Sequence, residues 1–553
     1  MDIYPSKAQF STNETVTLCL ICDDVLPISV QIRVLLLSKT VWEQDIVLAE
    51  KKTTVSIGSF PATFAGYGVN VYQQGDLVKP ILQTAFDVAE SPRKLLRYGF
   101  LSDFTERDRD NGALEWLLKC HINLVQFYDW SYRHDSLVAP QEDYHDMMGK
   151  EISGSTVKAK ITKAKALGMH PTAYGAVYAA SKPFFEKHPT WAFYNSCQEP
   201  FVFIDVFYIM NIAEGSPWRK HLFEEYQSAI SMMGFSGIHM DTYGFPKTAY
   251  SHLDAIPKQI KLENELPTLI DETRENVHGE EEPYLIFNNV GAWPVQRTAD
   301  RKQDAVYIEV WPPYERYASI AQLIRDARTY AKDDKSIILA AYLKPFREGK
   351  REKALPAAKL LMGSIVSNGA THLLTGENQT ALTQGYYSDY TKFSDSEAEA
   401  IRRYYDYMIR YENLFFDPEL QDVTMTHTGW DNYEYQCTSH KMSSYGEAGK
   451  IWMILREKDY RKCIYLLNLC GQSEDYWNEG KEEPDTQKDI KFRVQVDTPV
   501  ERICFSTPDG ENMDAVELPF TERATKTGKF IDFIVPSLNY WTTIWIDTRK
   551  ETI

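Results

Sequence analysis

Several kinds of segment are absent from this chain of 553 residues, and each absence narrows the range of functions. No run of about 18 apolar residues occurs, so no stretch is long enough to cross a bilayer as a helix. The first ten residues, MDIYPSKAQF, lack the charged start and apolar core of a signal peptide. Basic residues are in the minority, with 60 Lys and Arg against 78 Asp and Glu, which gives a net charge of -18. This charge disfavours nucleic acids and anionic membranes as partners and suits a neutral ligand.

Cysteine is also scarce. The eight cysteines are scattered over long segments, and the CxxC formed by Cys19 and Cys22 has no second CxxC or histidine pair to complete a zinc site. We therefore expect buried thiols, no metal and no cofactor. Reduced thiols fit a reducing compartment, so together with the missing leader they favour the cytoplasm. A secreted protein whose leader lies outside this sequence is the alternative.

Aromatic residues, in contrast, are abundant. They make up 13% of the chain, with 34 Tyr and 12 Trp, and gather beside polar residues in FYDW and VWPPYERY. Rings edged with hydrogen-bonding groups suit the apolar face and polar rim of a sugar, although such residues also enrich ordinary cores and interfaces. The overall composition, 43% hydrophobic and 25% charged, predicts a globular protein.

The chain divides into three stretches with different patterns, which predict three domains. Residues 1–92 hold short alternating segments such as TVTLCLIC, broken by Pro, Gly and Asn, and predict an immunoglobulin-like β-sandwich. The same pattern returns in residues 416–553, for example in IWMILREK, and predicts a second β-sandwich. Between them, residues 93–415 alternate strand-like runs with helix-like stretches, the longest of which is 252–276.

Eight strand-like runs in this central stretch predict a (β/α)8 TIM barrel with some enlarged loops. A doubly wound sheet is the alternative. The apolar segment 191–210 fits no ninth unit, and we interpret it as a loop after the third strand, near the mouth of the barrel. The eight runs are 97–104, 123–130, 170–178, 235–244, 283–290, 305–311, 335–343 and 371–377.

Two carboxylates stand at the carboxyl ends of these runs, where the active sites of barrel enzymes lie. Asp241 ends GIHMD in the fourth run, and Glu309 interrupts the apolar AVYIEVW of the sixth. Side-chain alternation would point both into the barrel. Glycoside hydrolysis needs one ionised carboxylate and one carboxylic acid, so the pair predicts a glycosidase in which Asp241 attacks the sugar and Glu309 exchanges the proton. Taken singly, Asp241 also fits a helix N-cap and Glu309 a salt-bridged residue at the rim.

Their surroundings would separate the two roles. Glu309 lies between Tyr307 and Trp311, and a partly apolar setting would keep it protonated to higher pH. His239 and neighbouring donors would favour the ionised form of Asp241.

Four blocks of the sequence resemble glycoside hydrolase family 66, the family of dextranases and cycloisomaltooligosaccharide glucanotransferases. They are RYGFLSDF, HINLVQFYDWSYRHDSLVAP, GFSGIHMDTYG and VYIEVWPPY. The order of sandwich, barrel and sandwich is also similar to that family's core, so the resemblance covers nearly the whole chain. It implies a retaining mechanism on α-1,6-linked glucan, with the nucleophile at the position of Asp241 and the acid/base at that of Glu309.

The resemblance also implies residues that hold the substrate. In the FYDW block, Asp129 would bind sugar hydroxyls and a neighbouring ring would stack on the sugar, although an aromatic barrel rim is the alternative. Trp311 would offer a platform on the acceptor side. Acidic residues such as Glu377 and Asp103 also fit helix caps. The expected substrate-binding residues are Tyr128, Asp129, Trp130, His134, Tyr174, His239, Asn289, Trp311, Glu377 and Asp103.

Hydrolases and transferases of this family share one catalytic pair and differ in whether water or a sugar hydroxyl reaches the glycosyl-enzyme. Members that cyclise their product resemble a barrel with an inserted carbohydrate-binding domain, and no insert of that size occurs here. We therefore expect an endo-dextranase, acting as a monomer. The alternatives are a cycloisomaltooligosaccharide glucanotransferase, an α-1,4-glucanase and a glucan-binding protein without activity.

Overall fold

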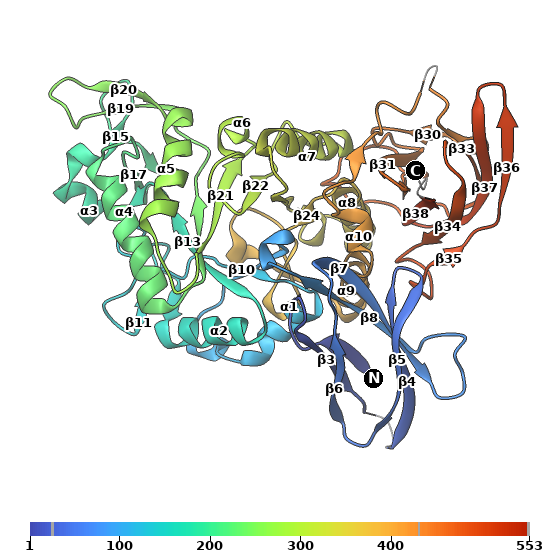
Figure 1. Ribbon diagram of the computed structural model, residues 1–553. Coiled ribbons are helices and arrows are strands. Elements are labelled where there is room, and N and C mark those ends of the chain that lie inside the picture. Colours follow the sequence, from blue (N-terminus) through green and yellow to red (C-terminus); the bar gives the residue numbers. More distant parts are fainter. Residues whose placement is uncertain (24–26, 430–431, 550–553) are drawn as a thin grey trace.

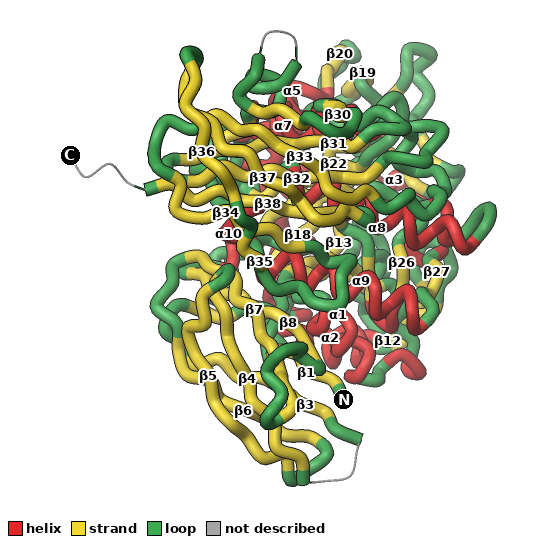
Figure 2. The backbone as a smooth tube through the Cα atoms, turned by 90° about the vertical axis from the view of Figure 1, so that its right-hand side faces the viewer, coloured by secondary structure: helices red, strands yellow, loops and turns green. Residues whose placement is uncertain are grey.

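The computed structural model describes residues 1–23, 27–429 and 432–549, which form a multidomain fold made mostly of sheets (Figure 1). The N-terminal strands, blue in Figure 1, and the C-terminal strands, red, form two groups on one side of a curled central sheet and its helices. Figure 2, turned by 90°, shows the C-terminal strand group above the N-terminal one, so the two groups lie next to different regions of the central part.

The N-terminal strands form two sheets around one apolar core. Side chains of β3 (Thr15–Ile21) alternate between buried and more exposed positions, so one face of the strand turns inward. One sheet has the order β1-β3-β6 and the other β2-β8-β7-β4-β5, and buried residues of both meet in a single cluster. The other strands are β1 (Asp2–Pro5), β2 (Phe10–Ser11), β4 (Ile28–Leu36), β5 (Lys39–Leu48), β6 (Lys52–Ser59), β7 (Phe64–Gln73) and β8 (Leu82–Ala89).

An 11-stranded curled sheet forms the centre of the molecule, and each of the eight predicted runs contributes to it. From β9 to β24 the neighbouring strands are parallel and follow chain order. Their carboxyl ends therefore lie at one end of the sheet. The strands are β9 (Tyr98–Leu101), β10 (Leu124–Phe127), β13 (His170–Ala176), β18 (Gly237–Asp241), β21 (Tyr284–Val290), β22 (Ala305–Glu309), β23 (Ser336–Ala340), β24 (Thr371–His372) and β25 (Thr375–Gly376), with β26 (Thr380–Ala381) and β27 (Thr391–Lys392) continuing at the edge.

The eighth predicted run is divided into β24 and β25. The first half pairs with β23, whereas Gly376 in the second half pairs in parallel with Phe100 of β9. One short segment thus connects the last strand of the series to the first.

Ten α-helices accompany the described part of the chain, most of them following the strands of the central sheet. Local signals fix their ends: Ser394 caps the first turn of α9 and Glu397 bonds back to the Ser394 backbone, a reciprocal capping box. The helices are α1 (Glu115–Lys119), α2 (Gly154–Ala166), α3 (Lys182–Lys187), α4 (Pro217–Ser228), α5 (Leu262–Asn276), α6 (Val295–Thr298), α7 (Tyr317–Ala331), α8 (Ala354–Ser367), α9 (Asp395–Arg410) and α10 (Glu412–Phe415).

Long connections after β13 and β18 carry small sheets of their own. The predicted loop 191–210 contains β15 (Phe193–Tyr194), β16 (Val202–Phe203) and β17 (Phe207–Ile209). The predicted helix over 252–276 is wrong in its first part, because β20 (Lys258–Lys261) pairs with β19 (Thr248–Ser251) before α5 begins. The remaining short strands are β11 (Asp143–His145), β12 (Glu151–Ser153) and β14 (Ala179–Ala180).

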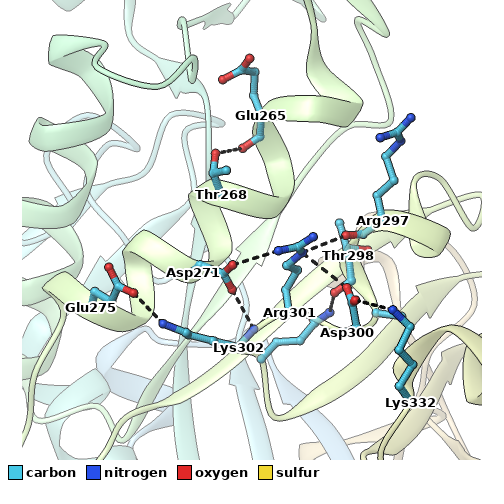
Figure 3. A network of polar contacts seen from close by, with 12 residues as sticks. Glu265, Thr268, Asp271, Glu275, Arg297, Thr298, Asp300, Arg301, Lys302 and Lys332 are labelled. Atoms are coloured by element: carbon cyan, nitrogen blue, oxygen red, sulfur yellow. Dashed lines mark hydrogen bonds and ion pairs between the residues drawn. The ribbon is translucent and has the colours of Figure 1, made fainter.

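A polar network holds α5 and α6 on the outside of the central sheet (Figure 3). Asp271 of α5 accepts a hydrogen bond from the backbone N–H of Lys302 at 3.0 Å and pairs with Arg301 at 3.4 Å. On the inner side of α6, the hydroxyl of Thr298 donates to Oδ1 of Asn289 at 2.6 Å. The exposed ion pairs contribute little each, but together these contacts fix the turn that leads into β22.

The C-terminal strands also form two sheets around a separate apolar cluster. A seven-stranded sheet contains β28 (Gln421–Asp422), β30 (Met442–Ser443), β31 (Ile451–Lys458), β32 (Arg461–Asn468), β34 (Val500–Ser506), β35 (Val516–Glu517) and β38 (Trp541–Thr548). A four-stranded sheet contains β29 (Tyr435–Cys437), β33 (Gln487–Gln495), β36 (Phe520–Thr525) and β37 (Gly528–Leu538).

One arginine of α9 joins all three parts of the molecule. Nη1 of Arg410 donates to Oδ1 of Asn70 in β7 at 3.0 Å, and Nη2 donates to the carboxylate of Asp514 in the C-terminal part. Asn70 itself donates to Asp514 at 2.8 Å. The Arg410 side chain is fully buried, so these charge-assisted bonds are shielded from solvent.

Glu412 is a buried acid beside the N-terminal sheets. Its side chain is fully buried, and neither carboxyl oxygen has a hydrogen-bond partner in the described structure. Burial raises the pKa of Glu412 well above its ordinary value, and the nearby Asp87 raises it further. The folded protein therefore keeps this proton at a pH where the unfolded chain, with an ordinary glutamate pKa of about 4.3, has lost it.

Replacing Glu412 by methionine is expected to stabilise the protein at neutral pH. Stability of the wild-type protein falls as pH rises above the unfolded pKa, because there the unfolded chain binds fewer protons than the fold. The variant loses this dependence and one unpaired buried group, worth about 1–3 kcal/mol. Thermal denaturation from pH 4 to pH 8 should show a gain that grows with pH. The matched control is Asp87→Asn, which removes the negative charge that accepts bonds of 2.9 and 3.0 Å from Arg97, keeps only one acceptor oxygen and should destabilise instead. A Glu412→Met variant less stable than wild type at pH 8 would contradict this account.

Several further features bear on the predictions from composition. No helix within the described residues is long and apolar enough to cross a membrane. Within the same residues no three His, Cys, Asp or Glu side chains gather as a metal site, and no disulfide links the cysteines. The expectation of buried thiols holds for Cys22, Cys120, Cys463 and Cys504, whereas Cys197 is exposed.

Candidate active site

A pocket of about 620 Å³ opens at the carboxyl ends of the central strands and contains both predicted catalytic residues. Asp241 is the last residue of β18 and Glu309 the last residue of β22, and both side chains are buried at its floor. Strand β21 lies between these two strands in the sheet. The pocket is lined by Gln126, Tyr128, Asp129, His134, Met148, Tyr174, Phe203, Ile204, Phe207, His239, Asp241, Thr242, Tyr243, Asn288, Val290, Glu309, Trp311, Tyr342, Gly385, Tyr386 and Tyr387.

A single amide group links the two carboxyl groups. Nδ2 of Asn288, on the intervening strand β21, donates to Oδ1 of Asp241 at 2.7 Å and to Oε2 of Glu309 at 2.9 Å. Because the bonds share one nitrogen, the two oxygens lie no further apart than the sum of the bonds, 5.6 Å. Retaining glycosidases hold their carboxyl groups about 5–5.5 Å apart, whereas inverting enzymes need about 6.5–9.5 Å to admit a water molecule. The arrangement fits the retaining geometry.

Two tyrosines hold the other carboxyl oxygens. The hydroxyl of Tyr174, on β13, donates to Oδ2 of Asp241 at 2.6 Å. The hydroxyl of Tyr342, just after β23, donates to Oε1 of Glu309 at 2.6 Å. Both carboxyl groups are therefore fixed in orientation by neutral donors, with no cation among the residues that bond to them.

Burial and mutual repulsion set the protonation of this pair. Burial, followed by the charge of Glu309, raises the pKa of Asp241 to about 7, although the bonds from Tyr174 and Asn288 oppose the rise. Burial also raises the pKa of Glu309, opposed by hydrogen bonds from Tyr342, Asn288 and Trp311. Two close buried carboxyl groups resist carrying two charges, so the pair keeps one proton near neutral pH.

His239 does not contact Asp241 in the way that the sequence predicts. It lines the pocket, but its Nδ1 is 2.9 Å from the hydroxyl of Tyr98, and Tyr174 and Asn288 are the side chains that donate to Asp241. Burial lowers the pKa of His239 to about 3, so the ring is neutral. It therefore brings no charge that would favour an ionised Asp241.

Asp129 is a third carboxyl group in the pocket. Its backbone has a φ of 49°, an uncommon conformation for a non-glycine residue. Among the described residues, no group donates a hydrogen bond to its side chain. Burial, with repulsion from Asp146, raises the pKa of Asp129 to about 8. A strained residue that presents an unpartnered carboxyl group to a pocket is suited to binding hydroxyl groups of a ligand.

Aromatic side chains and unpartnered polar atoms make up much of the remaining wall. Tyr128 stacks on Tyr387 at 4.4 Å, and His134 packs against Phe207 at 5.3 Å. Three buried polar atoms that belong to lining residues lack hydrogen-bond partners, namely Oε1 of Gln126, Nδ1 of His134 and Oδ1 of Asn288. Buried polar atoms are normally satisfied, so these are positions where a ligand would bind.

Four of the expected substrate-binding residues do not line this pocket. Trp130 is fully buried, with its indole N–H donating to the carbonyl of Tyr174, because the left-handed turn at Asp129 ends the strand alternation. Asn289 points outward: its amide donates to the carbonyl of Tyr307 and its oxygen accepts from Thr298. Its neighbour Asn288 faces the pocket instead, as alternation requires.

The two acidic candidates outside the catalytic strands have structural partners. Glu377 is buried in an ion pair with Lys160 of α2. Asp103 accepts a hydrogen bond from Tyr390 at 2.6 Å and pairs with Lys150 at 3.5 Å. Both lie outside the pocket, and their side-chain partners are Lys160, Tyr390 and Lys150 rather than the helix N-termini of the alternative interpretation.

Several residues of the site were not among the predictions. Asn288 and Tyr342 lie on the same alternation as other inward residues, so a stricter reading of strand register would have found them. Tyr386 and Tyr387 lie beyond the eighth predicted run, in the connection between β26 and β27, which carries no periodic signal. Phe203, Ile204 and Phe207 come from the hairpin of β16 and β17, which places the predicted loop 191–210 at the pocket.

Comparison with known proteins finds one matching family and several similar chains. The family model described as Glycosyl hydrolase family 66 matches residues 5–545. A cycloisomaltooligosaccharide glucanotransferase of Niallia circulans is 22% identical over 88% of this chain and 64% of its own length. A dextranase of Streptococcus salivarius is 21% identical over 69% of this chain and 53% of its own length. This chain therefore spans less than two thirds of the length of these relatives.

A solved structure shares the fold. The crystal structure of a Paenibacillus sp. cycloisomaltooligosaccharide glucanotransferase complexed with cycloisomaltoheptaose superposes with a TM-score of 0.88 and 18% identity. The superposition covers 99% of each chain. At this identity the likeness concerns the fold and leaves the activity of this chain to be argued from its site.

Proposed function

The chain belongs to glycosyl hydrolase family 66, and from this premise we propose that it is a retaining glycoside hydrolase that cleaves α-1,6-glucosidic links of dextran or isomalto-oligosaccharides. The observation that carries the proposal is the bridge by Asn288, which holds the oxygens of Asp241 and Glu309 within 5.6 Å of each other. The dextranase and the glucanotransferases among its relatives support the class of substrate.

In the first step Asp241, ionised, attacks the anomeric carbon and forms a glycosyl-aspartate bond. The bond from that carbon to the glycosidic oxygen breaks, and Glu309 gives its proton to the departing oxygen. In the second step Glu309 takes a proton from water, the water oxygen attacks the same carbon, and the bond to Asp241 breaks. Two inversions return the α configuration, and the enzyme recovers the proton it began with.

The wall of the pocket suits a glucose ring. Tyrosine and phenylalanine rings offer flat apolar surface, while Asp129 and the unpartnered atoms of Gln126, His134 and Asn288 offer partners for hydroxyl groups. No side chain in the lining set is basic apart from two neutral histidines, which disfavours an anionic sugar. We propose that the donor sugar lies over Asp241, with Trp311 on the acceptor side.

The architecture behind this site is proposed to be a (β/α)8 barrel over residues 93–415 between β-sandwiches over 1–92 and 416–553. Support comes from the parallel series of strands and from the pairing of β25 with β9. Of the other predicted roles, those of Tyr128, Tyr174 and His134 remain proposals for sugar contacts.

Transfer to a sugar hydroxyl, with cyclisation, is the second candidate function. The glucanotransferase relative favours it, and the shared fold is compatible with both outcomes. However, the alignment with that relative is 642 positions long yet covers 88% of this chain, so about 155 of its positions have no counterpart here. The solved glucanotransferase chain is nevertheless covered to 99% by this chain, so length alone does not separate hydrolysis from cyclisation, and the reaction products decide between them.

The test is to incubate the wild-type protein with dextran and follow viscosity, thin-layer chromatography and early proton NMR. An endo-hydrolase should lower the viscosity and release a ladder of linear isomalto-oligosaccharides whose new reducing ends are α anomers. Cyclic products would favour the transferase, and early β anomers would contradict retention. A protein that never lowers the viscosity, or that cleaves an α-1,4 glucan in preference, would overturn the proposal.

A further inference from the structure

A segment of the C-terminal part reaches back to the loops behind the catalytic glutamate. Residues 474–482, here named the C-terminal brace, lie between β32 and β33 and form no regular element. Figure 1 shows the C-terminal strands beside α7 and α8, on the side of the central sheet where β22 lies. The brace contacts the two loops that follow β22 and β23.

The first contact fixes the loop 310–316, which begins directly after Glu309. Backbone N–H groups of Tyr317 and Trp477 donate to the carbonyls of Asp475 and Glu315, each at 3.0 Å, so the brace adds a short antiparallel bridge to this loop. The indole N–H of Trp477, almost fully buried, donates to the carbonyl of Tyr314 at 2.6 Å. In turn, the N–H of Tyr314 donates to the carbonyl of Trp311 at 3.1 Å.

The second contact fixes the loop after β23. Oδ1 of Asn478 accepts a hydrogen bond from the backbone N–H of Lys344 at 2.9 Å, and the ammonium group of Lys344 pairs with Glu479 at 2.5 Å. Lys344 stands two residues after Tyr342. The brace is itself held in place by Lys481, whose fully buried side chain pairs with Glu474 and donates to the carbonyl of Tyr476 at 2.5 Å.

These two loops carry Tyr342 and Trp311, which both interact with Glu309. Tyr342 donates to Glu309 at 2.6 Å, Trp311 opposes the rise of its pKa, and Asn288 donates from the neighbouring strand β21 at 2.9 Å. Trp311 is 41% exposed, whereas Tyr342 is buried and contacts Trp311 edge to face at 5.8 Å, so the position of Trp311 depends on the backbone of its loop. Bonds from the brace add to those that the central part makes to the same loops, from the N–H of Val310 to the carbonyl of Ala340 at 3.0 Å and from the N–H of Leu343 to the carbonyl of Leu382 at 3.2 Å.

We propose that the C-terminal brace positions Glu309 through Trp311 and Tyr342, and that Trp477 and Asn478 are positioning residues for the acid/base step. This inference rests on the proposed function, because it assigns to Glu309 the proton transfer described above. The C-terminal part thus completes the acceptor side of the active site, in addition to packing against the helices.

The test compares two substrates over a range of pH. Dextran needs a proton on its leaving oxygen, whereas α-isomaltosyl fluoride loses fluoride without one. For Trp477→Phe and Asn478→Ala we expect kcat/KM on dextran to fall about tenfold or more, with kcat/KM on the fluoride within about twofold of wild type. Loosened donors also raise the pKa of Glu309, so the alkaline limb of the dextran profile should move to higher pH. Asn478→Asp keeps the acceptor oxygen and should restore most of the activity.

The matched control is Tyr407→Phe, which removes another buried hydrogen bond between the helices and the C-terminal part, from the Tyr407 hydroxyl to the carbonyl of Ser506 at 2.9 Å. It should lower the melting temperature and leave both kcat/KM values and the pH profile unchanged. Equal losses on the two substrates, or brace variants that behave like Tyr407→Phe, would overturn the inference. If Trp477→Phe does not fold, Asn478→Ala decides alone. Failure of the proposed function would give a different result from failure of this inference, because the wild-type protein would then cleave neither dextran nor the fluoride.

Discussion

Asp241→Asn is expected to lower the rate of dextran cleavage by about 10⁴-fold or more while the fold remains intact. The side chain of Asp241 accepts bonds from Tyr174 and Asn288, and an amide of the same shape keeps at least one of them. What the variant loses is the negative oxygen that forms the bond to the anomeric carbon. Steady-state rates on dextran, together with circular dichroism and melting curves, separate this loss from unfolding.

Azide should then reveal the role of Asp241. In Asp241→Ala the removed carboxyl group leaves space next to the anomeric carbon of α-isomaltosyl fluoride. Azide attacking from that side forms a carbon–nitrogen bond as fluoride leaves, with one inversion, so the product is the β-glycosyl azide. Wild-type rates in Asp241→Asn, or an α-glycosyl azide from Asp241→Ala, would refute the assignment.

Glu309→Gln is expected to lower kcat/KM on dextran by about 10²–10⁴-fold and to affect α-isomaltosyl fluoride far less, because fluoride leaves without a proton. The pH profile should change in a defined way. In the wild-type protein the two carboxyl groups titrate as a pair, so activity on dextran should rise as the pair loses its first proton and fall as it loses the second, which gives a bell-shaped profile. With glutamine at position 309 the fluoride profile should keep its acidic limb and lack the alkaline one.

The same variant tests the repulsion between the two carboxyl groups. Burial and then the charge of Glu309 raise the pKa of Asp241 to about 7, so without that charge Asp241 should titrate at lower pH. In Glu309→Ala, azide attacks the glycosyl-aspartate from the opposite face and should yield the α-glycosyl azide. The opposite pattern of azide products in the two alanine variants would exchange the roles of Asp241 and Glu309.

Strand periodicity was sufficient to predict that Asp241 and Glu309 share one pocket. In GIHMD, alternation put His239 and Asp241 on the inner face, and the same rule put Glu309 inward on its strand. Each of the eight predicted runs contains a strand, because buried parallel strands read as continuous apolar runs with polar residues at their ends. These features depend on local sequence, which a single chain displays directly.

Predictions failed where local alternation no longer controls side-chain direction. Trp130 follows Asp129, whose left-handed backbone reverses the expected side, and Glu377 follows a strand that is interrupted between His372 and Thr375. Asn289 was chosen over Asn288 although the strand pairing aligns Asn288 with Tyr307, an inward residue. That error was one of register, and the sequence contained the information to avoid it.

Other parts of the site depend on contacts between residues far apart in the chain. Tyr387 stacks on Tyr128, and Asn478 binds the loop of Lys344, yet no local pattern connects either pair. Whether a loop lies at a distant pocket depends on the tertiary fold of the whole chain, which local sequence patterns do not predict. The sequence alone therefore predicts the two carboxyl groups of the proposed reaction more readily than the residues that hold them.

The buried guanidinium of Arg410 has a consequence for how the molecule melts. It donates to the neutral Asn70 on one side and to the carboxylate of Asp514 on the other, so unfolding of the N-terminal strands would remove a hydrogen-bond acceptor and unfolding of the C-terminal part would leave the buried charge without its counter-ion. Breaking a buried ion pair in this way costs about 3–5 kcal/mol. Unfolding that begins in the N-terminal or the C-terminal strand group therefore destabilises the other two parts. The three parts are expected to unfold as one cooperative unit.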